Sequence, residues 1–375
     1  MARSTIMLAV AGSGKTYHIA NELDPSLNNL VITYTKQNVE NLKRELFLKY
    51  GSIPSKTQVI TFSSFVYRWL LKPFEPVLEI GDKVGLISEG VEIFHEPEPL
   101  RKSGKFNPKY VRQNNHKHYI LKNKYYSSRM SSLFLSQSPL VLKMILQRLQ
   151  FFGSHIYFDE LQDFMGDDFK LLVKLIKTPY LQIFAVGDFN QHSVSKSDFT
   201  ATKPFQKTNK SYLCIEEYKQ LFGKKVFIDE SSLINSRRVP NEICTVIKKK
   251  LGIRIESISE VSGFFKLLLE HSEIVGVLND PTIVKLFYNN SQIYNMSPVI
   301  NWSYSKGDTY EKCCIILTKT FEDLFEEHFS YNNLSPMQVN TLYVAMTRST
   351  HELYFIREKD FKKIKRSFLL QTHED

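Results

Sequence analysis

The sequence predicts an α/β protein built on two parallel sheets, with a smaller insertion in its first half. Strand-like runs rich in β-branched and aromatic residues alternate with helix-like segments, a pattern typical of parallel strands joined by helical crossovers. A first set of runs covers residues 5–10, 30–35, 58–62, 155–158 and 181–186. A second set covers residues 225–229, 298–302, 313–317 and 352–356, with a helical stretch at 241–251 after its first member. We therefore expect two α/β domains.

The composition is that of a folded protein with a surplus of positive charge. The chain has 375 residues, of which 42% are hydrophobic, and this is enough to form the cores of two or three domains. A disordered or fibrous chain is excluded. Lys and Arg number 49 against 39 Asp and Glu, which gives a net charge of +10. This surplus favours an anionic partner.

Cysteine spacing and hydropathy indicate the cellular setting. The four cysteines show no CxxC spacing and two are adjacent, so we expect neither a zinc ribbon nor a disulfide framework. No apolar run reaches eighteen residues, and no targeting signal is recognisable. The sequence therefore predicts a cytoplasmic protein with no membrane contact.

The insertion lies between the third and fourth strands of the first set, at about residues 71–152. The expected first domain consists of residues 1–70 and 153–224, and the second of residues 225–375. Residues 99–154 include no Asp or Glu but eleven basic residues, namely Arg101, Lys102, Lys105, Lys109, Arg112, Lys117, Lys122, Lys124, Arg129, Lys143 and Arg148. Five aromatic residues are interspersed, namely Phe106, Tyr110, Tyr119, Tyr125 and Tyr126. We expect a small basic helical insertion that tracks phosphates while its rings stack on bases; a solvated basic surface is the alternative.

A glycine-rich segment, AVAGSGKT at residues 9–16, follows the first strand and precedes a helix. In this context, backbone N–H groups and a helix N-terminus can hold phosphates, the lysine can neutralise β and γ oxygens, and the threonine hydroxyl can bind Mg²⁺. Ala9 stands where the general pattern has glycine, and a simple glycine turn is the alternative. The residues predicted to hold the nucleotide are Ala11, Gly12, Ser13, Gly14, Lys15 and Thr16.

Two carboxylates follow the apolar strand at residues 155–158. Asp159 is placed to hold Mg²⁺ together with Thr16, and Glu160 to orient or deprotonate the attacking water. On its own, an Asp-Glu pair after a strand is more often a solvated strand end. Combined with the glycine-rich segment, it predicts hydrolysis of a nucleoside triphosphate as well as binding.

With these two motifs in place, the chain resembles the UvrD/Rep-like superfamily 1 DNA helicases, whose further motifs occur here in the family's order. Residues 31–36 resemble motif Ia, and residues 59–65 resemble the motif that follows it and contacts single strands. Residues 186–191, 233–237, 305–307 and 342–348 resemble motifs III, IV, V and VI. The resemblance covers almost the whole chain and implies two RecA-like domains of the P-loop NTPase class, with ATP and Mg²⁺ bound at the cleft between them.

The resemblance also implies roles for individual residues. Gln191 would sense the γ-phosphate with help from Gln162, and Gly307 would contact the nucleotide. Arg237 and Arg348 would stabilise the charge that develops during transfer. The residues implied in single-strand contact are Tyr34, Thr35, Lys36, Phe62, Ser63 and Trp302.

Several positions differ from the family pattern. No glutamine precedes Ala9, and Ser236 replaces the base-stacking aromatic of motif IV, so we predict weak discrimination among ATP, GTP and CTP. Motif V has Ser303 for histidine and Thr309 for glutamate. The motif III aromatics are replaced as well, by Val194 and Lys196. About sixty residues separate positions 238 and 299, so we expect the family's large second-domain insertion to be absent.

The sequence thus predicts an ATP-dependent translocase or helicase on single-stranded or partly duplex DNA, moving 3′ to 5′ as the family implies. An alternative is a nucleic-acid-activated ATPase switch, or a loading subunit for a nuclease or defence effector, without processive unwinding. An RNA-directed ATPase is a further alternative, because phosphate contacts and stacking do not distinguish ribose from deoxyribose.

Overall fold

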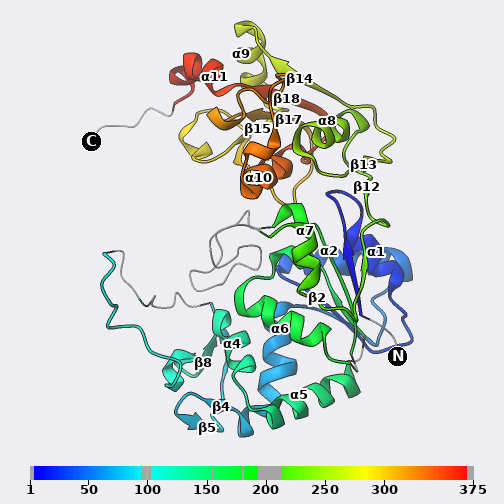
Figure 1. Cartoon of the computed structure of the whole chain (residues 1–375), viewed down its shortest axis with the longest axis vertical. Coiled ribbons are helices and arrows are strands. Elements are labelled where there is room, and N and C mark those ends of the chain that lie inside the picture. Colours follow the sequence, from blue (N-terminus) through cyan, green and yellow to red (C-terminus); the bar gives the residue numbers. More distant parts are fainter. Residues whose placement is uncertain are drawn as a thin grey trace. The chain divides into compact units, whose positions relative to one another are not determined.

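The computed structural model describes residues 4–93, 99, 103–153, 155–179, 181–192 and 213–369. These residues form two compact units (Figure 1). The first unit contains ranges 4–7, 15–187 and 213–229, and the second contains 8–14, 188–192 and 230–369, with the gaps given above. Each unit has its own parallel sheet, as expected. Positions 101 and 102 of the basic insertion and positions 194 and 196 of motif III lie outside the described residues.

The first sheet has six strands in the order β11-β1-β10-β9-β2-β3. Their bounds are Thr5–Leu8 for β1, Asn29–Thr33 for β2, Thr57–Thr61 for β3, His155–Phe158 for β9, Gln182–Gly187 for β10 and Phe227–Asp229 for β11. β2 is buried throughout and pairs in parallel with β3 and β9, as expected for a strand covered on both faces. The expected placement of 225–229 in the second set is wrong, because β11 pairs with β1.

Helices α1 (Lys15–Glu22), α2 (Lys36–Tyr50) and α6 (Gly166–Ile176) belong to this unit, as does the shorter α7 (Ile215–Gln220). The start of α2 is fixed by Thr35, whose hydroxyl accepts from the backbone N–H of Asn38, a standard N-cap. Gly51 ends α2 in the left-handed conformation, at φ 74°. α2 therefore starts directly after β2, at the carboxyl edge of the sheet.

The insertion is not purely helical, in contrast to the expectation. After α3 (Phe62–Phe65), a π-helical turn at Val66–Leu71 and a 3-10 turn at Lys72–Val77, it forms five short strands. These are β4 (Glu79–Ile80), β5 (Lys83–Val84), β6 (Gly90–Glu92), β7 (Ile120–Leu121) and β8 (Lys124–Tyr126). Two helices follow, α4 (Met130–Leu135) and α5 (Pro139–Phe152). The insertion thus contains both short strands and helices.

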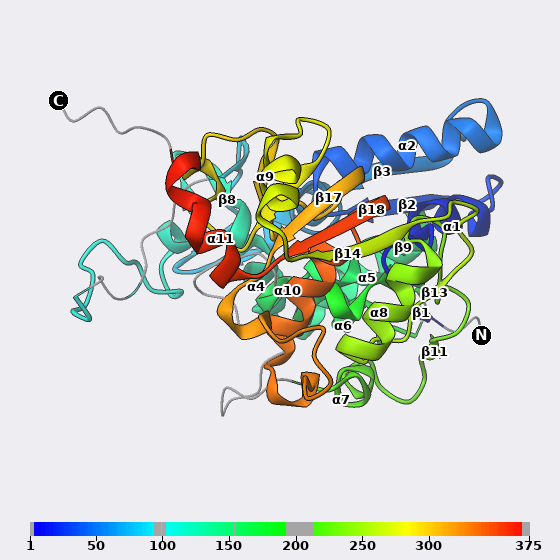
Figure 2. The ribbon, with the colours of Figure 1, turned by 90° about the horizontal axis from the view of Figure 1, so that it is seen from above.

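The second sheet has five parallel strands in the order β14-β18-β17-β15-β16. Figure 2 shows β14, β18 and β17 side by side. Their bounds are Phe264–Leu268 for β14, Val284–Phe287 for β15, Val299–Asn301 for β16, Tyr310–Ile316 for β17 and Ser349–Ile356 for β18. β16, β17 and β18 were expected, and β14 and β15 were not. Two-residue strands β12 (Asn235–Ser236) and β13 (Glu256–Ser257) pair separately.

The helices of the second unit are α8 (Asn241–Leu251), α9 (His271–Asn279), α10 (Pro336–Met346) and α11 (Glu358–Ile364). α8 has the predicted bounds. α10 starts with a capping box in which Ser335 and Gln338 bond reciprocally, and its residues from Asn340 onward are buried. Val10 and Ala11 belong to the same hydrophobic core as α10, which ties the glycine-rich segment to this unit.

Candidate functional site

The glycine-rich segment folds as a tight loop between β1 and α1. Ser13 donates to the carbonyl of Val10 from its backbone N–H, at 3.3 Å, and from its hydroxyl, at 2.9 Å. Gly12 and Gly14 have φ values of 72° and 85°, which favour glycine strongly. α1 begins at Lys15, so the loop leads directly into the N-terminus of a helix. Such a loop suits a phosphate group.

Gly12 also lacks room for any side chain. A Cβ built there would lie 2.6 Å from Ser236 Oγ and 2.7 Å from Arg238 Cβ. The Ser236 hydroxyl, fully buried, accepts from the backbone N–H of Val239 at 3.0 Å. The Arg237 backbone N–H in turn donates to the Gly12 carbonyl at 2.9 Å. The motif IV segment therefore packs directly on the glycine-rich loop.

The carboxylates at the end of β9 lie beside the start of α1. Thr16 Oγ1 donates to Asp159 Oδ2 at 3.4 Å, and Lys15 Nζ lies 3.6 Å from Glu160 Oε2. Gln162 Nε2 donates to the same Glu160 oxygen. Glu160 has φ 54°, a left-handed conformation that costs a non-glycine residue about 1–2 kcal/mol. The structure thus brings together five of the predicted residues, namely Lys15, Thr16, Asp159, Glu160 and Gln162.

The Asp159 side chain is almost fully buried, and this burial, with the neighbouring Glu160 charge as second cause, raises its pKa above the usual value of an aspartate. Among the described residues, no group of three or more His, Cys, Asp or Glu side chains could hold a metal by itself. One carboxylate and one hydroxyl are nevertheless the protein ligands that suit Mg²⁺ when phosphate oxygens and water complete its octahedral shell. The residues present therefore fit a nucleotide-bound Mg²⁺.

Asp188, which follows β10, anchors a buried polar network. Its Oδ2 accepts from Gln191 Nε2 at 2.8 Å and from the Tyr343 hydroxyl at 3.1 Å, and its Oδ1 accepts from the Asn190 N–H. The same Tyr343 hydroxyl accepts from the backbone N–H of Ala11 at 2.9 Å. Burial, followed by the Asp188 charge, raises the pKa of Tyr343 well above its usual value. The network thus connects Gln191 to the glycine-rich loop.

A second contact joins the same turn to α10. Asn340 Nδ2 lies 3.1 Å from Nδ1 of His192, and both residues are buried. The His192 ring also contacts the carbonyl of Phe189. Burial is the main cause that lowers the pKa of His192 to about 4, so its ring is neutral at pH 7. Both residues lie within or beside the quoted motifs, but their pairing is visible only in the structure.

Arg348 is buried and directed at backbone oxygens. Its guanidinium donates to the carbonyls of Val344, Ser305 and Asp308 at 2.7–3.2 Å, and to Thr347 Oγ1 at 3.0 Å. Burial, together with repulsion by Arg238, lowers its pKa to about 9. The carbonyl oxygens compensate this buried charge, and the predicted contact of Arg348 with a triphosphate stays a prediction.

The neighbouring arginines of motif IV point differently. The Arg237 side chain is exposed. The Arg238 side chain packs on Gly12, with Nε 3.3 Å from the position of a Cβ there, and its guanidinium donates to Thr309 Oγ1 at 3.2 Å. Arg238 is therefore a candidate that sequence reasoning missed, although the arginine doublet itself was an available signal. Gly307, another predicted nucleotide contact, has φ 93°, and apart from its chain neighbours no heavy atom of the described residues lies within 4 Å of the point where a Cβ would stand.

Three of the residues predicted to contact nucleic acid line one cavity in the first unit. Tyr34, Phe62 and Ser63 share a cavity of about 270 Å³ with Ser131 and Asp168. Phe62 packs edge-on against Phe164, with ring centroids 4.9 Å apart. Nearby, Thr35 is the N-cap of α2, and Lys36 is exposed at its first position.

Two expectations about nucleic-acid contact are wrong. Trp302 is fully buried, packs in the core of the second unit and donates from Nε1 to the Leu286 carbonyl at 2.9 Å, so its ring has no face for a base. In the insertion, Tyr119, Tyr125 and Tyr126 are buried core residues. Phe106 remains exposed, as do the basic residues Lys105, Lys109, Arg112, Lys117, Lys122 and Lys143.

Comparison with known proteins finds similarity to solved structures. No protein-family model matches the chain, and neither does any curated protein. Among solved structures, the PRRSV helicase has 13% identity and a TM-score of 0.44, and the match covers 98% of this chain and 55% of that one. The DNA complex of arterivirus nonstructural protein 10, a helicase, has 10% identity, a TM-score of 0.44, and coverages of 94% and 60%. The chain thus spans little more than half the length of these structures. Within the described residues, no helix is long and apolar enough to cross a membrane.

Proposed function

We propose that this protein is a Mg²⁺-dependent nucleoside triphosphatase that moves along single-stranded nucleic acid, with ATP as a substrate and DNA as the expected track. The observation that carries the proposal is the pairing of Lys15 with Glu160 and of Thr16 with Asp159 at the end of a glycine-rich loop. A lysine and a hydroxyl at a helix start, each facing a carboxylate, form a site for a metal-bound triphosphate.

Each of these side chains has a role in hydrolysis. Lys15 would leave Glu160 and neutralise phosphate oxygens, which frees the Glu160 carboxylate to accept a proton from water. Gln162, already bonded to Glu160, would hold that carboxylate in place. Thr16 and Asp159 would bind Mg²⁺, which supplies charge neutralisation at the phosphates.

The second unit would supply the remaining groups. Gln191, held by Asp188, can donate to a phosphate oxygen and accept from water. Arg348 and Arg238 would stabilise the charge that develops on the transferred group, as guanidinium groups do in other NTPases. Arg237 and Gly307 remain proposed contacts on the basis of their motifs. Base selection is expected to be weak, because Ser236 offers no ring for stacking.

The proposed track begins at the carboxyl ends of β2 and β3. Tyr34, Phe62 and Ser63 line one cavity there, and Thr35 and Lys36 lie at the adjacent start of α2. An aromatic and hydroxyl lining next to an exposed lysine suits one base and its phosphate. A 3′-to-5′ direction, a place among UvrD/Rep-like enzymes and an ability to unwind DNA are parts of the proposal that rest on the motif resemblance.

A second candidate function is an NTP-driven switch or loading subunit for a nuclease or another effector. The burial of Trp302 favours it, because one stacking residue expected in a processive motor is missing from the track. A duplex with a 3′ single-stranded overhang distinguishes the two functions, since only a motor separates its strands without a partner.

The test of the main proposal is the NTPase rate of the chain with and without single-stranded DNA, at several salt concentrations. We expect stimulation by DNA that declines as salt rises, because phosphate contacts release counterions. Lys15→Ala should abolish turnover, with Lys43→Ala on the exposed face of α2 as the control. A wild-type rate for Lys15→Ala would refute the site.

A further inference from the structure

We propose that the outer face of α5 is a docking surface for an acidic amphipathic helix of a protein partner. The inference is independent of the proposed NTPase function. It starts from the distribution of exposed apolar side chains within the described residues. Ten of the 23 large hydrophobic side chains that are exposed lie in the insertion, at Val77, Val84, Ile87, Ile93, Phe106, Leu121, Leu140, Met144, Phe151 and Phe152. This is nearly half of them, although the insertion provides only 74 of the 336 residues that the structure describes.

On α5 these side chains form an ordered stripe rather than scattered exposures. Leu140, Met144 and Phe151 are 69%, 41% and 78% exposed, and with the exposed Gln147 they follow the spacing 4, 3, 4 along the helix. That spacing is the alternation of a coiled-coil seam, in which each side chain enters a hole on a facing helix. We call residues 140, 144, 147 and 151 the α5 seam.

The opposite side of the helix is already used. Val141, Leu142, Ile145 and Leu149 are buried against the unit, so α5 is apolar on both sides. A surface helix normally has one apolar face, directed at the core, and a polar face on the outside. An exposed stripe of this kind marks an interaction site more often than a solvated surface. The seam is therefore half of a helix–helix contact.

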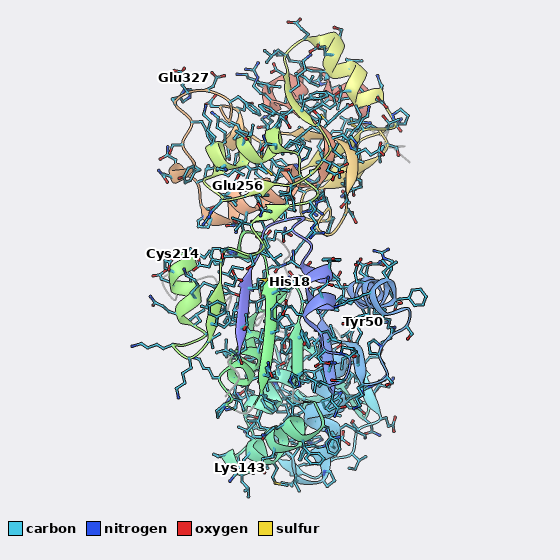
Figure 3. The ribbon with its side chains drawn as sticks, turned by 90° about the vertical axis from the view of Figure 1, so that its right-hand side faces the viewer. His18, Tyr50, Lys143, Cys214, Glu256 and Glu327 are labelled. Carbon is cyan, nitrogen blue, oxygen red and sulfur yellow. The ribbon has the colours of Figure 1, made fainter. Side chains whose placement is uncertain are left out.

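Charge identifies the partner that fits. Residues 99–154 include no acidic side chain, and Lys143, exposed on the outer side of α5, borders the seam (Figure 3). Arg148 borders it on the other side, with its guanidinium over the rings of Trp69 and Phe152. Basic flanks beside an apolar seam match a helix with apolar seam residues and acidic flanks.

The same charges disfavour other occupants. Two copies of α5 facing each other would place basic flanks together with no acidic residue on either helix to compensate. A nucleic-acid strand would need cations along the contact, whereas the seam itself consists of three apolar residues and one glutamine. The helix has 14 residues, about 21 Å, so the contact is short and the affinity is expected to be micromolar or weaker.

The test uses the full chain and two fluorescein-labelled 21-residue peptides with leucine at every seam position. One carries glutamate at the flanking positions and the other lysine, and binding is followed by fluorescence anisotropy. We expect saturable binding of the glutamate peptide only. Met144→Glu and Phe151→Glu should each weaken it at least tenfold, and Lys143→Glu several-fold. Leu48→Glu, at an exposed leucine of α2, is the matched control and should have no effect.

The side chains at positions 144 and 151 are exposed, so the variants are expected to keep their circular dichroism spectra and melting temperatures. Absence of binding, or equal binding of both peptides, would overturn the proposal. So would concentration-dependent dimerisation of the chain that Met144→Glu abolishes, which would assign the seam to a second copy. Displacement of the peptide by a single-stranded oligonucleotide would assign it to nucleic acid. None of these readouts depends on NTP hydrolysis.

Discussion

The hydroxyl of Tyr343 accepts a 2.9 Å hydrogen bond from the backbone N–H of Ala11, 332 residues earlier in the chain. It donates at the same time to Asp188, which holds Gln191. One side chain of α10 therefore fixes both the glycine-rich loop and the turn that carries the proposed γ-phosphate sensor.

Tyr343→Phe removes only the hydroxyl and leaves the Ala11 N–H and one Asp188 lone pair without that partner. We expect a loss of about 1–3 kcal/mol in the free energy of unfolding, because these groups are buried. We also expect a larger loss in kcat than in KM for the nucleotide. Urea unfolding and steady-state kinetics measure the two effects. Tyr354→Phe is a suitable control, because the Tyr354 hydroxyl donates to Glu352, another residue of the partly exposed strand β18. Equal kinetics for both variants would mean that Tyr343 has no positioning role.

Glu160→Gln keeps the shape of the side chain but removes the proposed base. Turnover should fall by roughly 10²- to 10⁴-fold, the usual contribution of a general base. Binding of a fluorescent nucleotide should persist, because Lys15 and the loop are unchanged. Glu22→Gln, on the exposed end of α1, should leave both measurements unchanged. Loss of binding together with turnover would indicate that Glu160 acts structurally.

The two adjacent arginines of motif IV can be separated experimentally. Arg238→Ala should lower kcat by roughly 10²-fold or more, because its side chain packs on Gly12 and is an electrostatic neighbour of Arg348. Arg237→Ala should have a smaller effect, because its side chain is exposed. The ratio of the two kcat values decides the assignment. If Arg237→Ala lowers kcat more than Arg238→Ala does, the result would support Arg237, the residue that the motif resemblance implies.

The buried His192 should make the free energy of unfolding depend on pH. Its pKa is lowered from 6.5 to about 4 by burial, so the unfolded chain binds more protons than the folded one between these values. The stability of the fold should therefore be fully present above pH 6.5 and decline as the pH falls towards 4, by up to about 3 kcal/mol. Asn340, the Phe189 carbonyl and the Lys306 charge face this ring, and none of them is an acid that could stabilise the protonated form.

The measurement is urea unfolding for the wild type and for His192→Gln at about pH 7, above the expected decline, and at about pH 4.5, near its lower end. The variant should show a smaller difference between the two pH values, since a neutral amide replaces the titrating ring. His328→Gln, at an exposed histidine, should behave as the wild type. An unchanged pH dependence in His192→Gln would contradict the assignment.

The nucleotide base should contribute little to specificity. Ser236 stands where motif IV of the family has a stacking aromatic, so values of kcat/KM for ATP, GTP and CTP should agree within roughly tenfold, equivalent to about 1.4 kcal/mol. Competition among the three nucleotides in a phosphate-release assay tests this. A strict preference for ATP would require a base contact elsewhere in the chain.

Local patterns predicted the strands with clear apolar runs and the bounds of α8. They missed β15 because Lys285 interrupts its apolar run. The Lys285 ammonium group donates to the Asp280 and Ser297 carbonyls, and these bonds allow this lysine to be fully buried in the strand. β11 was assigned to the wrong sheet because the order of strands along the chain does not determine which strands pair. Such pairing depends on tertiary contacts.

For the candidate site, too, local sequence patterns predicted some residues and missed others. The loop and the carboxylates of β9 were recognisable because their chemistry depends on residues close together in sequence. Tyr343 and Asn340 were not, because their partners lie more than a hundred residues away. Trp302 was misassigned because a motif position does not reveal whether a ring faces the core or the solvent. Arg238 was overlooked because side-chain direction within a doublet depends on the backbone.

Val10 and Ala11 are core residues of the unit formed mainly by residues 230–369, although the strand before them belongs to the other sheet. A polypeptide that stops after β11 would therefore contain every residue of the glycine-rich loop without the apolar surroundings in which that loop takes shape. Neither half of the protein is expected to be a self-sufficient nucleotide binder, and mixing separately produced halves should restore binding only when Val10 and Ala11 can dock into their distant core.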